Sequence, residues 1–295
     1  MRRVASRSDP IATSQCLGAL ASRRRVVRPP EKETRRRDAG AARLACGSLG
    51  FIDIVTMSAQ THRGAASEDH RLFASEQLAT LRAAAADFCW LLDRDYAPHS
   101  ALELVGNRFS LAARQRMAIS RYACSSAEVE RRQKRCIDLQ QACGHELWID
   151  GYNVLTLIES ALSGGVVLIC RDGCCRDIAG IHRRYRKVSE TMPALQLVGE
   201  TLAAADVASC RWWLDKPVSN SGRLKTAISE IAAANDWKME VELAFSPDHE
   251  LSHTENPVTT SDGVILDRSR VWVNLARHII AERVPGANII DLASQ

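Results

Sequence analysis

Aspartates stand at, or shortly after, the ends of several extended runs of this sequence. The five that do so are Asp150, Asp172, Asp215, Asp262 and Asp267. Carboxylates that converge repel one another and raise each other's pKa, unless a hard divalent cation such as Mg²⁺ or Mn²⁺ binds among them. The residue types therefore predict a metal site suited to phosphodiester cleavage. Each aspartate taken alone also fits an ordinary turn or helix cap.

The elements that must position these aspartates alternate between strand and helix after Cys143. Apolar runs predict strands at 147–149, 166–170, 211–214, 239–245 and 271–275, with helices between them at 154–163, 191–205 and 222–235. This alternation predicts an α/β fold with a parallel sheet flanked by helices. Because ligands bind beyond the carboxyl ends of such strands, we expect the aspartates to meet in one pocket.

The chain before the predicted sheet divides into a basic leader and a helical region. Residues 1–56 contribute +7 to the net charge of +4, so the remainder carries −3. We expect residues 1–66 to be a disordered or wrongly assigned leader, with Met57 as an alternative start of translation. Residues 67–143 have helical periodicity throughout and predict an all-α domain of unknown role, and residues 144–295 predict the α/β domain.

Basic and amide side chains accompany the aspartates along the chain. Those that we predict to bind nucleic acid are Asn153, Arg176, Arg183, Arg184 and Lys225. Guanidinium and ammonium groups suit phosphates, so a basic rim around an acidic metal site fits a nucleic-acid backbone. A solvated charged face has the same sequence pattern. Glu159, on the predicted helix after Asp150, is a further candidate metal ligand.

The segment HELSH (249–253) fits a different chemistry. In a zinc peptidase, His249 and His253 would bind the metal and Glu250 would act as general base. That arrangement needs a helix of several turns, and flanking prolines limit this one to about two turns. A zinc peptidase is therefore the weakest hypothesis, and Asp248 gains importance if this segment lies over the pocket.

WIDGYN, followed by the helical stretch VLTLIESAL, resembles the opening strand and turn of PIN-like nuclease domains, including their NYN branch. TTSDGVILD resembles the later Ser/Thr-x-Asp segment of the same superfamily. Residues 145–295 resemble a prokaryotic PIN-like family in which a helical domain of unknown function comes first. The resemblance implies these metal-facing residues: Asp150 and Asp262 first, then Asp172 and Asp267, and then Asp215 and Glu159.

These observations predict a metal-dependent phosphodiesterase, with an endoribonuclease as the first hypothesis. The predicted catalytic residues are Asp150, Asp172, Asp262 and Asp267. Mg²⁺ or Mn²⁺ is the predicted cofactor, RNA the predicted partner with single-stranded DNA as the alternative, and a homo-oligomer is compatible. The second hypothesis is a non-catalytic RNA-binding or regulatory protein of the same fold. Ten cysteines without paired spacing indicate reduced thiols in the cytoplasm, and no apolar run approaches the roughly 20 residues that span a membrane.

Overall fold

The computed structural model describes residues 62–179, 185 and 187–293. The predicted leader therefore lies outside the described residues, apart from 62–66. Within the described ranges, no helix is both long and apolar enough to cross a membrane.

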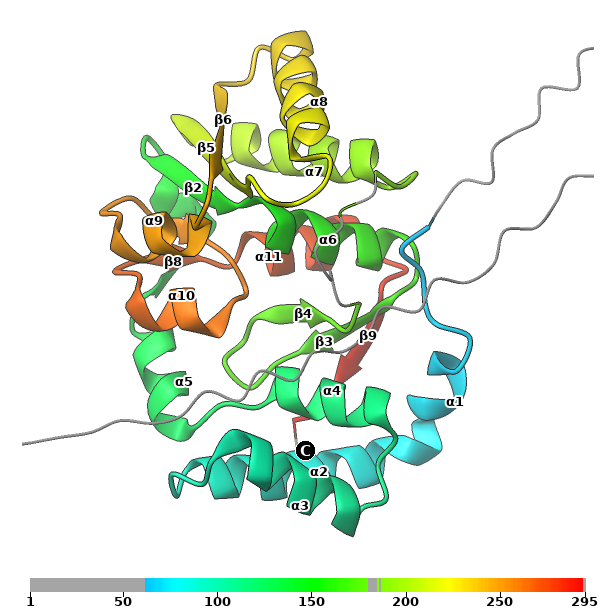
Figure 1. Ribbon diagram of the computed structural model, residues 1–295. Coiled ribbons are helices and arrows are strands. Elements are labelled where there is room, and N and C mark those ends of the chain that lie inside the picture. The colour runs from blue at the N-terminus through cyan, green and yellow to red at the C-terminus, as the bar shows by residue number, and fades with distance from the viewer. Residues whose placement is uncertain (1–61, 180–184, 186, 294–295) are drawn as a thin grey trace, which may run out of the picture. The chain divides into compact units, whose positions relative to one another are not determined.

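Helices lead into the main sheet, as the helical periodicity predicted (Figure 1). They are α1 (Asp69–Leu72), α2 (Ser75–Leu92), α3 (Pro98–Arg108), α4 (Ala113–Tyr122) and α5 (Ser126–Gln133). Pro98 stands at the start of α3, where its missing N–H costs no helical hydrogen bond. The prediction of helical structure throughout 67–143 is wrong after α5, where the chain forms β1 (Cys136–Ile137) and the 3₁₀ helix η1 (Leu139–Ala142).

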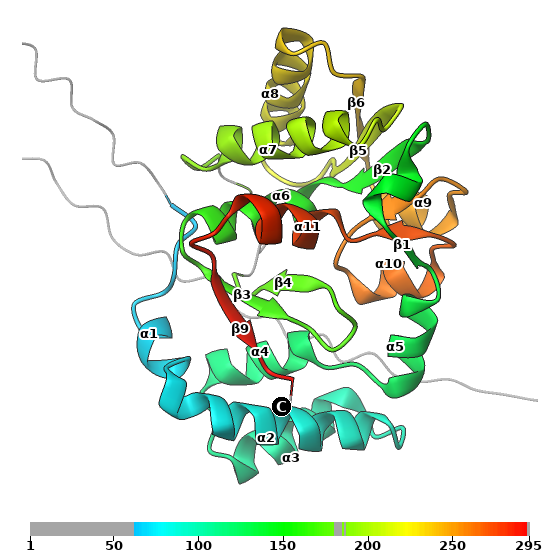
Figure 2. The same cartoon turned by 180° about the vertical axis from the view of Figure 1, so that it is seen from behind.

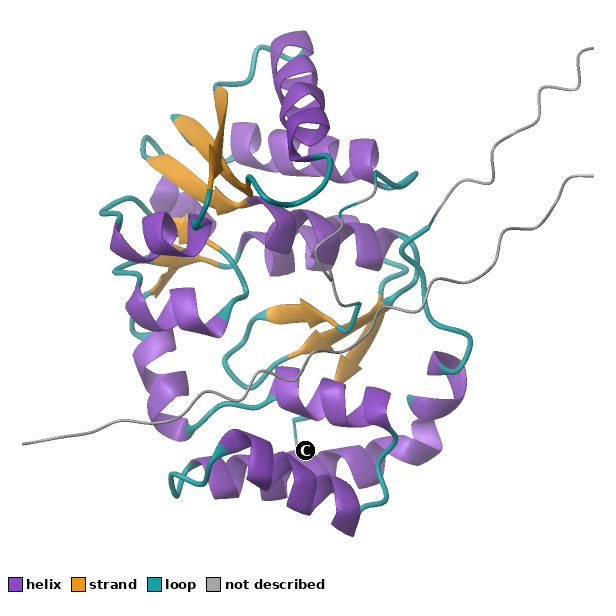
Figure 3. Cartoon of the chain, viewed as in Figure 1, coloured by secondary structure: helices purple, strands orange, loops and turns teal. Residues whose placement is uncertain are grey.

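The main sheet is entirely parallel, with six strands in the order β1-β8-β7-β2-β5-β6 (Figure 3). Its further strands are β2 (Glu146–Asp150), β5 (Ser209–Asp215), β6 (Met239–Ala244), β7 (Val258–Thr259) and β8 (Trp272–Val273). The helices that follow or join these strands are α6 (Gly151–Leu162), α7 (Thr191–Ala204), α8 (Ser221–Ala234), α9 (Pro247–His253), α10 (Gly263–Arg268) and α11 (Leu275–Arg283). The predicted α/β fold is confirmed.

Alternation along β2 explains how the main sheet is covered on both faces. Leu147 and Ile149 are fully buried in the core that α6, α7, α8 and α11 share. Trp148 points to the opposite face, where it packs with Trp213 against a small core from α9, α10 and β7. Since side chains alternate along a strand, Asp150 lies on the same face as Trp148, toward α9 and α10.

The strand predicted at 166–170 belongs to a second sheet, so the residues after it do not lie at the end of the main sheet. This strand, β3 (Val166–Ile169), pairs antiparallel with β4 (Cys175–Asp177) and parallel with β9 (Asn288–Asp291), outside the main sheet. Figure 2 shows α6 between the two sheets. The second sheet shares its core with α2 and α4, which belong to the predicted helical domain. The expectation that all the aspartates meet at one sheet edge is therefore wrong for Asp172.

The order of the main strands places a crevice beside β2. The chain passes from β2 to β5 and β6 on one side, and later adds β7 on the other side. Strand order thus reverses between β2 and β7, and in parallel α/β sheets ligands bind beyond the carboxyl ends at such a switch point. Asp150 and the segment TTSD lie there.

Candidate active site

Asp150 and Asp262 come together through a short chain of hydrogen bonds at this switch point. The Thr260 hydroxyl donates to Oδ2 of Asp150 at 2.6 Å and accepts from the Asp262 N–H at 3.0 Å. Asp262 caps α10, with Oδ1 accepting from the Val264 N–H at 2.7 Å. Asp150 and Asp262 thus lie close together, and their shared metal ion stays a prediction.

The glycine of WIDGYN allows the turn after Asp150 to press against β5. A Cβ at Gly151 would lie 2.4 Å from Cδ2 of Leu214 and 2.9 Å from the carbonyl oxygen of Trp213. No side chain fits there without movement of the strand, so glycine is required for the close approach rather than for an unusual φ angle.

Asn153 holds the TTSD segment in place from the first turn of α6. Its side-chain oxygen accepts from both the N–H and the hydroxyl of Ser261, each at 2.8 Å. Nε of Arg176 donates to the Ser261 carbonyl at 2.7 Å. The side-chain oxygen of Asn153, which the sequence predicts to contact nucleic acid, is thus engaged by the segment that carries Asp262.

Four carboxylates form what we call the acidic cluster: Asp150, Asp215, Asp248 and Asp262. Burial raises the pKa of Asp150 to about 7, the charges of Asp262 and Asp248 add to this, and the Thr260 hydrogen bond opposes it. Burial and then Asp248 raise the pKa of Asp215, and burial and then Asp262 raise the pKa of Asp248. Asp248 reaches the cluster from α9, as expected if HELSH lies over the pocket.

The acidic cluster has no countercharge within the described part of the chain, where none of its four members forms an ion pair. Lys216, which follows Asp215 directly, instead places its ammonium 4.8 Å from the centre of the Phe245 ring. Repelling carboxylates without a cation partner are typical of functional sites, because structural carboxylates are ordinarily paired.

Tyr152 adds a polar group without a partner beside the cluster. Its side chain is 6% exposed, and its hydroxyl has no hydrogen-bond partner among the described residues. Burial and then the charge of Asp215 raise the pKa of Tyr152 to about 12, so the hydroxyl stays protonated and can donate. The hydroxyl is therefore available as a hydrogen-bond donor near Asp215.

Asp172 and Asp267 occupy a different environment, which we call the arginine-paired group together with Arg132 and Arg176. Arg132 donates to Oδ2 of Asp172 at 2.7 Å and to Oδ2 of Asp267 at 2.8 Å, and Arg176 donates to Oδ2 of Asp172 at 2.6 Å. Burial alone would raise the pKa of both aspartates, but the guanidinium groups outweigh burial and lower it.

Asp172 and Asp267, which the sequence predicts as metal-binding and catalytic residues, are thus paired with arginines. Guanidinium groups already hold the position that a cation would take. The buried Arg176 is likewise committed to Asp172 and to carbonyl groups, which corrects its predicted role in binding nucleic acid. Sequence reasoning missed Arg132 as the partner, because its only signal was a charged helix face.

The predicted metal ligand Glu159 also belongs elsewhere. It is fully buried and accepts from Nε of Arg63, the hydroxyl of Tyr185 and the hydroxyl of Thr191, each at 2.6 Å. The prediction fails because the side chain faces α7 and the residues before α1, away from the end of β2.

The remaining predicted nucleic-acid contacts lie apart from the acidic cluster. Arg183 and Arg184 fall outside the described residues, and Lys225 lies partly exposed on α8. A hollow of about 310 Å³ adjoins Asp262 and has Arg121, Arg132 and Arg176 in its wall. Arg121, with its side chain 38% exposed, is the arginine of this hollow that reaches solvent.

HELSH forms α9, a helix of seven residues, as short as the flanking prolines predicted. The rings of His249 and His253 stack at 4.4 Å, and Nδ1 of His253 donates to the His249 carbonyl at 2.7 Å. Over the ranges that the structure covers, no three His, Cys, Asp or Glu side chains are grouped to hold a metal ion. The zinc peptidase hypothesis thus gains no third ligand.

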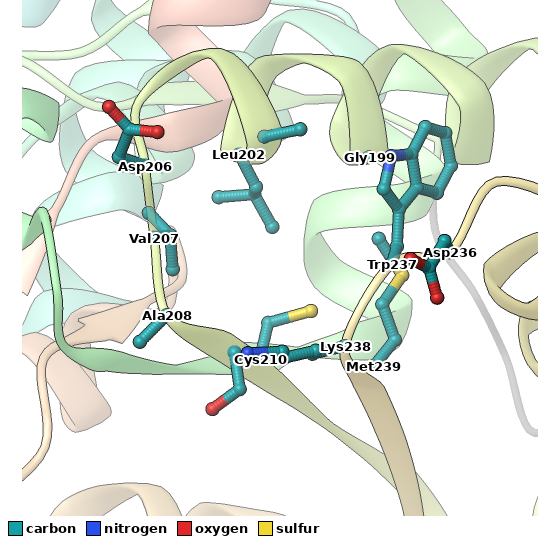
Figure 4. Close-up of a pocket in the computed structure, with 12 residues that line it drawn as sticks. Gly199, Leu202, Asp206, Val207, Ala208, Cys210, Asp236, Trp237, Lys238 and Met239 are labelled. Carbon is teal, nitrogen blue, oxygen red and sulfur yellow. The ribbon is translucent and has the colours of Figure 1, made fainter.

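A second hollow, of about 270 Å³, lies at the opposite edge of the main sheet (Figure 4). Trp237, Met239, Cys210 and Leu202 line it, at the amino ends of β5 and β6. Ligands of parallel sheets bind at the carboxyl ends of the strands, so the acidic cluster is the better candidate for chemistry.

Comparison with known proteins matches two family models to this chain. Residues 139–278 match "Domain of unknown function (DUF5616)", and residues 80–135 match "Protein of unknown function (DUF434)". Neither description names a PIN-like family, an activity or a ligand. No solved structure matches the chain.

An uncharacterized protein of Methanocaldococcus jannaschii is 30% identical over 192 residues, which cover 65% of this chain and 91% of the archaeal protein. The two family models cover residues 80–135 and 139–278, which are most of the helical region and most of the α/β region. The chain therefore belongs to the family of this archaeal protein, with DUF434 in its helical region and DUF5616 over the acidic cluster.

Proposed function

We propose that the protein is a metal-dependent phosphodiesterase with a PIN-like fold and RNA as its substrate. The observation that carries the proposal is the convergence of four unpaired carboxylates at the switch point of a parallel sheet. Burial and mutual repulsion leave Asp150 with a pKa near neutrality, a state that a bound cation would relieve.

The residues of the cluster fit Mg²⁺ or Mn²⁺. Their donors are all oxygens, which hard cations prefer, and Mg²⁺ is usually held by one or two carboxylates with waters and substrate phosphates in the other positions. Asp150 and Asp262 would hold the ion, with Asp248 and Asp215 acting through water. When bound, the cation supplies charge stabilisation and an activated water for phosphodiester hydrolysis.

Other residues of the chain would orient the reacting groups. Thr260 fixes one oxygen of Asp150, and Asn153 fixes the segment that carries Asp262. The protonated hydroxyl of Tyr152 can donate to a water or a phosphate oxygen near Asp215. Arg121 supplies an accessible guanidinium beside Asp262 for the nucleic-acid backbone.

Cleavage of labelled single-stranded RNA and DNA, in Mn²⁺ and in EDTA, tests the proposal. We expect cleavage of RNA in Mn²⁺ that falls about 100-fold or more in Asp150→Asn and Asp262→Asn, because several kcal/mol of transition-state stabilisation are lost. Asp236→Asn, an exposed aspartate at the other edge of the sheet, is the matched control. Cleavage that survives both cluster variants would reject the proposal, and loss of activity in His249→Ala alone would favour the zinc hypothesis.

A non-catalytic RNA-binding or regulatory protein is the second candidate. It is favoured by one finding, that the described side chains offer no complete group of three metal ligands. RNA binding without cleavage in any divalent metal would support this candidate over the nuclease.

A further inference from the structure

Phe245 is an aromatic side chain left open to solvent at the edge of the sheet that carries the acidic cluster. It is 76% exposed, more than any other large apolar side chain that the structure describes. It follows the last residue of β6 and precedes α9, which contributes Asp248. Single exposed apolar side chains are common on protein surfaces, so what makes Phe245 a candidate for ligand contact is its position close to the end of β5 that carries Asp215.

The strand register fixes the position of Phe245 relative to the cluster. Ala244, the residue before it, pairs with Asp215 across the parallel ladder between β5 and β6. The N–H of Lys216 then donates to the Ala244 carbonyl at 2.8 Å, one residue beyond Asp215. The backbone at Phe245 is thus anchored at the end of a regular ladder, one residue beyond the partner of Asp215.

Lys216 gives this edge a positive charge directly beside the ring. Its ammonium lies 4.8 Å from the ring centre, and no ion pair of the described residues includes it. Adjacent side chains of an extended strand point to opposite faces, so Lys216 is not expected to pair with Asp215. Its place over Phe245 instead joins an aromatic surface and an ammonium in one small exposed unit.

We propose that Phe245 and Lys216 form a binding subsite for one nucleotide of a single-stranded nucleic acid. The ring stacks on an unpaired base, and the ammonium contacts the adjoining phosphate. Bases inside a duplex are already stacked on their neighbours, so the subsite selects unpaired segments. The inference rests on the proposed function, because it names the form of substrate that the acidic cluster would receive.

Binding measurements on the full chain test this subsite separately from cleavage. Fluorescein-labelled oligouridylate is titrated with protein and followed by anisotropy, with Ca²⁺ in place of Mg²⁺ or Mn²⁺ to slow cleavage. We expect Phe245→Ala to weaken binding about tenfold and Phe245→Trp to restore it, because base stacking depends on an aromatic face. Lys216→Met should weaken binding less and make it less sensitive to salt.

Trp90→Ala is the matched control, since Trp90 is also exposed (53%) and also lies under a cation, the guanidinium of Arg94 at 3.6 Å, but on α2. Its binding should equal that of the wild type. A series of oligonucleotides, each lacking one base at a different position, then locates the base that stacks on Phe245. One of them should bind the wild type more weakly than the intact oligonucleotide does. The same oligonucleotide should bind Phe245→Ala as well as the intact one does.

The subsite would be overturned by unchanged affinity in Phe245→Ala, or by no binding of the oligonucleotide by the wild type. Equal binding of a duplex with the same dependence on Phe245 would also overturn it. If binding depends on Phe245 but no divalent metal supports cleavage, the proposed phosphodiesterase activity is rejected and the proposed subsite is retained.

Discussion

The acidic cluster and the arginine-paired group use the same residue type in similar places, yet their electrostatics are opposite. Asp150 is the last residue of β2, and Asp172 lies shortly after β3. At Asp172 the guanidinium groups outweigh the effect of burial and lower the pKa. At Asp150 the carboxylates of Asp262 and Asp248 add to burial and raise the pKa to about 7.

The contrast shows where each group obtains its countercharge. A carboxylate removed from water is stable only when paired, hydrogen-bonded or protonated. The arginine-paired group carries its cations within the chain and so connects α5, α10 and the loop after β3. The acidic cluster has no such cation among the described residues, as expected of a site that binds its cation from solution.

The largest expected effect comes from removing the countercharge of the arginine-paired group. Arg132→Met should lower the free energy of unfolding by about 3–5 kcal/mol, because it leaves a buried carboxylate with too little compensation. Urea denaturation measures the loss. Lys134→Met, which breaks an exposed pair with Glu130 nearby, should cost no more than about 1 kcal/mol. Equal losses of unfolding free energy in Arg132→Met and Lys134→Met would show that the arginine-paired group is no more important for stability than an exposed ion pair.

A smaller effect should follow from supplying a cation to the acidic cluster. Mn²⁺ at about one hundred times its Kd should stabilise the wild type by about 3 kcal/mol, seen as a rise in Tm. Asp150→Asn should abolish the rise. Arg132→Met should keep it in spite of a lower starting Tm, and loss of the rise there would indicate that the two groups are not independent.

Without a cation, the acidic cluster should make folding less favourable as pH increases. The pKa of Asp150 is higher in the folded state, about 7 against an ordinary 3.8. Its contribution to the free energy of unfolding is therefore fully present at low pH and is lost as pH rises through 7. In EDTA near pH 8, Asp150→Asn should be more stable than the wild type by about 1–2 kcal/mol, after allowance for solvent screening. Thermal unfolding across this range checks the sign; a variant that is less stable would refute it.

The arginine-paired group should respond to pH in the opposite direction, with the smallest effect. The pKa values of Asp172 and Asp267 are lower in the folded state, so their contribution is present above the ordinary aspartate range and is lost as pH falls through it. Between about pH 5 and pH 3 the wild type should lose roughly 1 kcal/mol more than Arg132→Met. Parallel curves for the two proteins would count against this assignment.

Much of the fold could be predicted because it depends on local pattern. Apolar runs of strand length and helices with a 3.6-residue period identified β2, β5, β6, α6, α7 and α8. The very short strands β1 and β4, and the strand β9, escaped because a few residues carry too little periodicity. Nothing local shows that β3 leaves the main sheet, since the apolar run of a buried strand is the same in either sheet.

Two of the four carboxylates of the acidic cluster could be predicted together from sequence motifs. Asp150 and Asp262 were found from the motifs WIDGYN and TTSDG, because Asp150 ends one strand of the main sheet and Asp262 follows shortly after another. Asp248 depended on where α9 would lie, and the role of Tyr152 depended on which buried groups remain without a partner. Those are properties of packing, and no spacing in the sequence expresses them.

The sequence by itself determined that the chain forms a parallel α/β sheet after a helical region, and that aspartates follow its strands. Only the tertiary structure decided which of these aspartates lack a cation. The physical reason is distance along the chain: Arg132 reaches Asp267 from 135 residues away, and Thr260 reaches Asp150 from 110 residues away. Local propensity sets the elements, whereas the charge balance of a site is set by side chains that folding alone brings together.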